Sequence, residues 1–213
     1  MQTTTTKSLW DSVGGLSNPH KMPGLSYGLP ADECKVGSLL RKVKGSTCSD
    51  CYAKKGRYGM TNVQKAQYRR LELLKQDPVK WGNDMVELLR RKYRGKTGDD
   101  RVFRWHDSGD LQGFWHLALL AGIATSLPDI QFWLPTREAA IVRQYERITP
   151  FPPNLMVRVS SAMVGGKVPD FKYTSGVDDP SGFQCPAPEQ GGKCGCCRAC
   201  WSFTVGHVSY HKH

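Results

Sequence analysis

The 213-residue sequence lacks several features that would place it in common protein classes. No hydrophobic run approaches the roughly 20 residues of a membrane-spanning helix, so we expect no membrane span. Residues 1–6 are polar, with no apolar segment behind a positive flank, which predicts an intracellular protein without a signal peptide. The pattern G-x-S-x-G of many serine hydrolases is also absent.

Acidic residues are scarce: 19 stand against 30 lysines and arginines, for a formal net charge of +11. The excess lies in residues 35–96, where 17 basic residues face 5 acidic ones. Such a stretch favours a phosphate-bearing partner, such as a nucleic acid or an anionic cofactor. Two solvated helix faces would give the same count, and the aromatic strand motif of RNA-binding domains is missing. Both interpretations stay open.

All eight cysteines fall into two clusters at opposite ends of the chain, and their spacing is typical of metal ligation. If Cys196 is set aside, the last three cysteines of the second cluster are spaced C-x2-C-x2-C, and a Cys-Pro pair precedes them. Bacterial ferredoxins use this ligand set in the other order. The N-terminal cluster is Cys34, Cys48 and Cys51, and the predicted metal ligands of the C-terminal cluster are Cys185, Cys194, Cys197 and Cys200.

Three kinds of cysteine site fit these spacings. An iron–sulfur cluster, most simply [4Fe–4S], fits the triplet best. A structural zinc ion could use four thiolates from the two ends of the chain, namely Cys48, Cys51, Cys197 and Cys200. A disulfide framework suits short secreted chains and is the third alternative.

Hydrophobic periodicity predicts an α/β protein with a short parallel β-sheet or a partial (β/α) barrel. We expect strands at 101–105, 130–134 and 155–159, and helices at 61–74, 78–95, 111–125 and 136–147. Thr61 with Gln64 predicts a capping box, and Asp77 an N-cap. The chain is interpreted as one domain, 1–213, with a loop-rich cysteine segment at 1–60, a core at 61–160, and a C-terminal cysteine-rich segment at 161–213 that metal, rather than apolar packing, orders.

Polar residues follow each predicted strand, where ligands bind in parallel α/β folds. Any one of them could serve only as a cap, because Asp110 and Thr136 precede predicted helices. Their convergence at one sheet edge nevertheless predicts an active site. His116, on an apolar helix, is interpreted as a core residue, and His207, His211 and His213 as a solvated tail. The candidate catalytic residues are His106, Asp107, Ser108, Asp110, Arg137 and Glu138.

Several long motifs resemble those of the bacteriophage "gene product 88" family, and the resemblance covers nearly the whole chain. They are Lys21-Met-Pro-Gly24, Gly45-Ser-Thr-Cys48, Cys51-Tyr-Ala-Lys-Lys-Gly-Arg-Tyr58, Phe103-Arg-Trp-His-Asp-Ser-Gly-Asp110, Trp133-Leu-Pro-Thr-Arg-Glu138 and the segment from Cys185-Pro-Ala187 to Cys200-Trp201. The resemblance implies a phage origin and action in the cytoplasm of the infected bacterium.

The Cys-x-x-Cys-Tyr-Ala segment and the strands ending in Gly-Asp and Thr-Arg also resemble radical S-adenosylmethionine enzymes. This resemblance implies a partial or full barrel in which Cys34, Cys48 and Cys51 hold a [4Fe–4S] cluster that binds S-adenosylmethionine. Those enzymes usually space the cysteines C-x3-C-x2-C, whereas thirteen residues separate Cys34 from Cys48 here.

Three functions follow as hypotheses. The first is an iron–sulfur enzyme that acts on an unknown small molecule at the strand ends. The second is a hydrolase in which the cluster is structural and the segment around His106 activates water or a serine. The third is a metal-stapled nucleic-acid-binding protein that uses residues 35–96.

Overall fold

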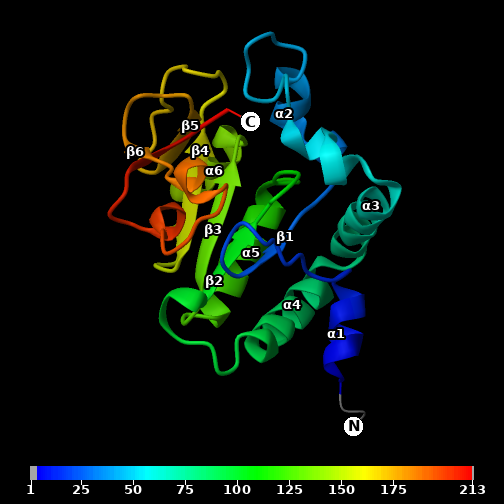
Figure 1. Ribbon diagram of the computed structural model, residues 1–213. Helices are drawn as coiled ribbons and strands as arrows, with labels where there is room; N and C mark the ends of the chain where they lie inside the picture. Colours follow the sequence, from blue (N-terminus) through cyan, green and yellow to red (C-terminus); the bar gives the residue numbers. More distant parts are fainter. Residues whose placement is uncertain (1–3, 213) are drawn as a thin grey trace.

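Seven parallel strands form one sheet in the computed structural model, which describes residues 4–212 (Figure 1). Their order across the sheet is β1-β2-β3-β4-β5-β7-β6, so β1 and β6 are its edges. This arrangement confirms the predicted α/β class. The strands are β1 (Leu25–Tyr27), β2 (Val102–Trp105), β3 (Gln131–Thr136), β4 (Leu155–Ser160), β5 (Thr174–Val177), β6 (Phe183–Gln184) and β7 (His207–Tyr210).

The helices precede or connect the first four strands in chain order. One crossover helix joins β2 to β3 and another joins β3 to β4, as parallel pairing requires. The α-helices are α1 (Thr6–Ser12), α2 (Lys35–Leu40), α3 (Thr61–Gln76), α4 (Pro78–Lys92), α5 (Phe114–Ser126) and α6 (Ala139–Glu146). Single-turn 3₁₀ helices lie at Ala31–Glu33, Tyr52–Lys54, Gly56–Gly59, Gly98–Asp100, Ala187–Gln190 and Ala199–Trp201.

The two faces of the sheet are covered differently, because successive side chains of a strand point to opposite faces. Phe103 and Trp105 of β2 join the main core with apolar side chains of the helices. Val102, on the other face, packs with Trp133 and with Trp201 of the cysteine-rich C-terminal segment. Figure 1 shows α3 and α4 on one side of the sheet and the orange-to-red C-terminal segment on the other.

The elements with a sustained hydrophobic period lie where the sequence predicts them. β2, β3, β4 and the helices α3 to α6 agree with the predicted elements to within a few residues, and Asp77 caps α4 by accepting from the backbone N–H of Lys80. The predicted capping box is wrong: Met60 is the N-cap of α3, and no side chain caps it. Within residues 4–212, no helix has both the length and the apolar character that a membrane span requires.

Helix α5 begins three residues later than predicted, for a reason that concerns the site. The Asp110 side chain bonds the backbone N–H of Leu111 and also reaches β3, so it holds residues 110–113 outside the helix. The N–H of Gln112 donates to Nδ1 of His116, and Gly113 becomes the N-cap. Helix α6 likewise begins at Ala139, because Thr136 remains part of β3.

The N-terminal segment is better ordered by apolar packing than the sequence suggests. Leu9 and Val13 of the α1 region, and Tyr27 and Leu29 around β1, are almost fully buried in the main core. The phenol of Tyr27 donates to the Val13 carbonyl at 2.8 Å. Part of the segment predicted as loop-rich, residues 6–29, therefore belongs to the main core.

Candidate functional site

Asp110 ties the ends of β2 and β3 together. Its Oδ1 accepts from the Thr136 hydroxyl at 2.5 Å and from the Leu111 N–H at 2.7 Å. Its Oδ2 accepts from the Arg137 N–H at 2.8 Å. Burial raises the pKa of this carboxyl to about 6, although the three hydrogen bonds act in the opposite direction. Asp110 therefore fixes the backbone at two neighbouring strand ends.

Arg137 and Glu138 carry this arrangement outward to the N-terminal cysteine segment. Both Nε and Nη2 of Arg137 donate to the hydroxyl of Thr47, at 2.9 and 2.7 Å, and Thr47 immediately precedes Cys48. The Glu138 carboxylate accepts from the backbone N–H of Val36 at 2.9 Å, two residues after Cys34. The strand ends thus position the two loops that carry the thiols.

Cys34, Cys48 and Cys51 gather above these strand ends. Burial raises the pKa of Cys34, and the charges of Asp110, Cys51 and Cys48 raise it further, so the three thiols are close enough to interact. Burial also raises the pKa of Cys48, while the guanidinium of Arg137 lowers it. We call Cys34, Cys48 and Cys51 the N-terminal thiol set.

Gly37 of α2 gives this set its space. A Cβ built on Gly37 would lie 3.6 Å from Sγ of both Cys34 and Cys48, and only 3.0 Å from Cβ of Cys34. The two sulfurs are therefore at most about 7 Å apart. A side chain at residue 37 would enter the region between them.

Two tyrosines connect the N-terminal thiol set to Asp107. The phenol of Tyr52, next to Cys51, donates to the Asp107 carbonyl at 2.6 Å. The phenol of Tyr58 lies 3.4 Å from that carbonyl and from Oδ2 of Asp107. Asp107 Oδ1 is buried and accepts no hydrogen bond within residues 4–212.

His106 is the most unusual residue of the strand-end segment. Its backbone has a φ of +53°, which is uncommon for a residue with a side chain. The ring is buried, and neither nitrogen has a hydrogen-bond partner among the described residues. Burial, with the charges of His116 and Arg104, lowers its pKa well below the usual range. A neutral imidazole held in a strained backbone is typical of a functional position.

Ser108 has a structural environment. Its hydroxyl donates to the Leu29 carbonyl at 2.6 Å and accepts from Nε2 of Gln67 at 3.1 Å. Neither bond involves His106, so the structure offers no serine–histidine pair at this segment. His116 is buried as predicted, and burial lowers its pKa to about 3.

The four other predicted ligands gather on the sheet face opposite the main helices. Burial raises the pKa of Cys194, and the charges of Cys185 and Cys197 raise it further. Burial raises the pKa of Cys200 to about 12. The thiol of Cys200 lies 3.2 Å from the Tyr210 hydroxyl. We call Cys185, Cys194, Cys197 and Cys200 the C-terminal thiol set. All eight cysteines of the chain are free, so the disulfide alternative is not supported.

Two arginines that the sequence analysis did not single out lie beside the C-terminal thiol set. Arg158 is fully buried, and its guanidinium donates to backbone carbonyls of residues 174 and 199–206, including Cys200. Arg104 lies over the Trp133 ring at 4.5 Å, and its charge lowers the pKa of Cys194 and of Cys200. A signal existed, since each arginine interrupts a buried, otherwise apolar strand.

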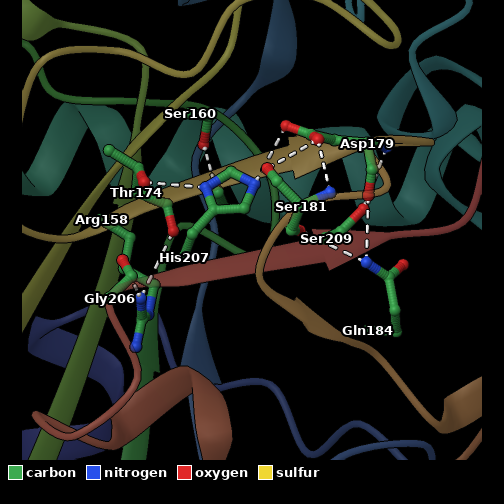
Figure 2. A network of polar contacts seen from close by, with 10 residues as sticks. Arg158, Ser160, Thr174, Asp179, Ser181, Gln184, Gly206, His207 and Ser209 are labelled. Atoms are coloured by element: carbon green, nitrogen blue, oxygen red, sulfur yellow. Dashed lines mark hydrogen bonds and ion pairs between the residues drawn. The ribbon is translucent and has the colours of Figure 1, made fainter.

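A second polar network continues from Arg158 across the last strands (Figure 2). Arg158 Nη1 donates to the carbonyls of Thr174 and Gly206, and the Thr174 hydroxyl bonds His207 Nδ1 at 2.8 Å. His207 Nε2 lies 3.3 Å from the Asp179 carboxylate. His207 is therefore not part of a solvated tail as predicted, because it belongs to β7. His213 lies outside the described residues.

Within residues 4–212, no three histidine, cysteine, aspartate or glutamate side chains stand together as a ready-made metal site. That includes the mixed set of Cys48, Cys51, Cys197 and Cys200 proposed for zinc. Sulfurs around one zinc ion, with Zn–S bonds near 2.3 Å, stand only about 4 Å apart. A four-iron cluster is larger and needs its ligands further apart.

Some of the basic charge in residues 35–96 is paired with carboxylates. Lys54 and Arg41 pair with Asp32, and Lys55 pairs with Asp50. Lys80 of α4 pairs with Asp84, and two arginines of the same helix pair with Glu87. Most of the 17 basic residues form no ion pair within residues 4–212, so the nucleic-acid hypothesis stays a prediction.

The comparisons identify a family and little else. The model of the family described as Gene product 88 matches residues 2–203. No curated protein matches the chain, and no solved structure does.

Proposed function

This chain belongs to the gene product 88 family, and we propose that it is an iron–sulfur protein whose N-terminal thiol set holds a [4Fe–4S] cluster at an active site. The observation that carries the proposal is that Cys34 and Cys48 flank the space at Gly37 and that Cys51 is near enough for its charge to act on both, above the strand ends. Three thiolates for four irons leave one coordination position for a ligand other than protein. A cluster bound in this way supplies an electron or a Lewis acid to that ligand.

The strand-end residues take different roles in this proposal. Asp110, Arg137 and Glu138 are positioning residues, because their side chains bond the backbone or the loops that carry the thiols. His106 and Asp107 remain candidate catalytic residues, since each keeps a buried polar atom without a partner among residues 4–212. Ser108 serves packing. The hydrolase alternative would have to use water or a serine other than Ser108. S-adenosylmethionine binding is not part of the proposal, because no comparison supports the radical-enzyme resemblance.

We further propose that the C-terminal thiol set holds a second, closed metal centre, with iron–sulfur preferred over zinc. The argument is one of charge. Arg158 is fully buried and pairs with no carboxylate in the part of the chain that the structure describes, and a buried cation without a counter-charge is costly. A centre with four thiolates carries net negative charge and would compensate this guanidinium group.

Anaerobic purification tests the proposal directly. Protein from iron-supplied cells should be brown, absorb broadly near about 400 nm, and contain iron and acid-labile sulfide. Cys34→Ser and Cys194→Ser should each lose part of this absorption, because each breaks a different set. Cys196→Ser is the matched control, since Cys196 is exposed and belongs to neither set. Colourless wild-type protein, or protein with stoichiometric zinc and no sulfide, would refute the proposal.

The same protein preparation tests the two remaining hypotheses. Salt-dependent binding of DNA or RNA by colourless protein would favour the nucleic-acid binder. Ester hydrolysis without reductant would favour the hydrolase. As a bacteriophage protein, it would act in the cytoplasm of the infected host.

A further inference from the structure

A cavity of about 290 Å³ opens beside Asp107. One wall is a face of α3, where Asn62, Ala66 and Arg70 recur at intervals of four residues. Ser17 and Tyr58 close other sides. Sites for small molecules usually enclose about 300 Å³ or more, so this cavity has the size for a small metabolite.

Arg70 brings a positive charge to the cavity. Its Nε donates to the Gly14 carbonyl at 3.2 Å and its Nη1 to the Ser17 hydroxyl at 3.0 Å, while the guanidinium lies 5.2 Å from the centre of the Tyr27 ring. These contacts fix the side chain, which is only 8% exposed. Nη2 donates no hydrogen bond to any residue from 4 to 212, and no carboxylate there forms an ion pair with Arg70.

Asp107 brings a negative charge to the same cavity. It is also 8% exposed, and the phenol of Tyr58, 3.4 Å from Oδ2, is its weak partner. Its Oδ1 is buried without a partner, in space that exists because residue 28 is glycine: a Cβ on Gly28 would lie 2.1 Å from that oxygen. Across residues 4–212, no lysine or arginine lies within ion-pair distance of Asp107, and the guanidinium of Arg104 interacts with it through charge alone.

A buried cation and a buried anion, neither of them in an ion pair, therefore line one cavity without meeting each other. A buried charge without a paired counter-charge is unfavourable, and a ligand with both opposite charges would pair with both. We propose that this cavity binds a small zwitterion of the amino-acid class, with its carboxylate at Arg70 and its ammonium group at Asp107. A planar guanidinium is well suited to a carboxylate, because it offers paired donors.

The cavity and the thiol site share Asp107. Its carboxylate lines the cavity, and its carbonyl accepts from Tyr52, the neighbour of Cys51. A ligand seated at Asp107 is therefore beside the proposed cluster, and this makes it a substrate. The assignment of the ligand as a substrate rests on the proposed function, whereas its binding does not.

The test uses the full chain, purified anaerobically. Each of the common α-amino acids is screened for a rise in melting temperature, and each one that raises it is titrated by calorimetry. We expect at least one to bind, and the amine and the carboxylic acid that each lack one of its charges to bind at least about tenfold more weakly. Failure of every amino acid to bind, or equally tight binding of a singly charged analogue, would overturn the proposal.

Two variants and a control locate the site. Asp107→Asn should weaken binding about thirtyfold or more, because it leaves the ligand's ammonium group buried without a counter-charge. Ala66→Leu fills the cavity from a helix position, so it should block binding even if Asp107→Asn fails to fold. Lys65→Leu, an exposed neighbour on the same helix, should bind as wild type does. Unchanged binding in Ala66→Leu would overturn the assignment of the cavity.

Iron and sulfide are measured on the same samples. Brown protein that binds no amino acid overturns this inference and leaves the proposed function intact. Colourless protein that binds an amino acid overturns the proposed function and leaves the site intact.

Discussion

Replacement of Arg158 by methionine should be among the most destabilising single changes in this protein. The side chain is fully buried in β4 and holds the cysteine-rich C-terminal segment against the sheet. Its guanidinium makes six hydrogen bonds of 2.7 to 3.3 Å, all to backbone carbonyls. Methionine keeps much of the volume and removes every donor.

The magnitude follows from two opposing effects. Hydrogen bonds from a charged donor contribute about 1.5–3 kcal/mol each, so six of them set an upper bound of roughly 9–18 kcal/mol. Burial lowers the pKa of Arg158, which reflects the cost of keeping its charge away from water. Removal of that charge regains several kcal/mol, and freed loop carbonyls can turn to solvent. We expect a net loss of about 3–5 kcal/mol, typical of breaking a buried polar network.

For a chain of this length, such a loss lowers the melting temperature by about 6 to 20 °C. Thermal unfolding followed by circular dichroism measures it, and limited proteolysis should show cleavage first between residues 199 and 206. Arg143→Met is the control, because Arg143 is half-exposed and its contacts, with Asp170 and the Phe171 ring, lie at the surface. Equal melting temperatures for the two variants would refute the view that Arg158 holds this segment.

Three further predictions concern the site. Gly37→Ala should lower the iron content per chain, because its Cβ enters the space between Cys34 and Cys48 and lies only 3.0 Å from Cβ of Cys34, so Cys34 must shift; iron content equal to that of wild type would contradict this. Asp110→Asn should remove a slope from the pH dependence of unfolding. The raised pKa of about 6 means that the folded state binds the proton more tightly than the unfolded state, so the contribution of Asp110 to stability falls as the pH rises from about 4 to about 6 in wild type. Equal slopes in both proteins would contradict this. Lys42→Glu with Lys44→Glu, which reverses two exposed charges, should leave iron content unchanged, and iron loss would indicate that the charge of residues 35–96 serves the cluster.

The elements predicted from the sequence are those whose side chains repeat with a period over four or more residues. β3 shows the apolar run of a buried strand, and α4 shows a stripe from Trp81 to Leu89 after its Asp77 cap. β1, β5, β6 and β7 are not predicted from the sequence, and residues 161–213, which hold the last three, are expected to be loop; these strands have two to four residues each, too few to display a clear alternation. Their pairing is decided by distant partners, such as Tyr27 opposite Trp105 across the β1–β2 pair, and local patterns do not record it.

The sequence predicted which residues lie at the site better than it predicted what each of them does. The strand-end rule brings Asp110 and Arg137 together as expected. The rule does not predict that both oxygens of Asp110 accept hydrogen bonds from backbone and hydroxyl donors, or that Glu138 accepts a hydrogen bond from the loop after Cys34. Those bonds cross 26 to 102 residues of sequence. The polar atoms of His106 and Asp107 that have no hydrogen-bond partner can be identified only from the three-dimensional structure.

One side chain reaches both thiol sets, and this constrains how they act. Arg104 Nη2 donates to the Tyr52 hydroxyl at 3.2 Å, beside the N-terminal thiol set. The same guanidinium lowers the pKa of Cys194 and of Cys200 in the C-terminal thiol set. Its position in the middle of β2, between Phe103 and Trp105 of the main core, allows it little movement. A change of charge at either set therefore acts on a cation that the other set also senses, so we expect the two proposed metal centres to be coupled electrostatically.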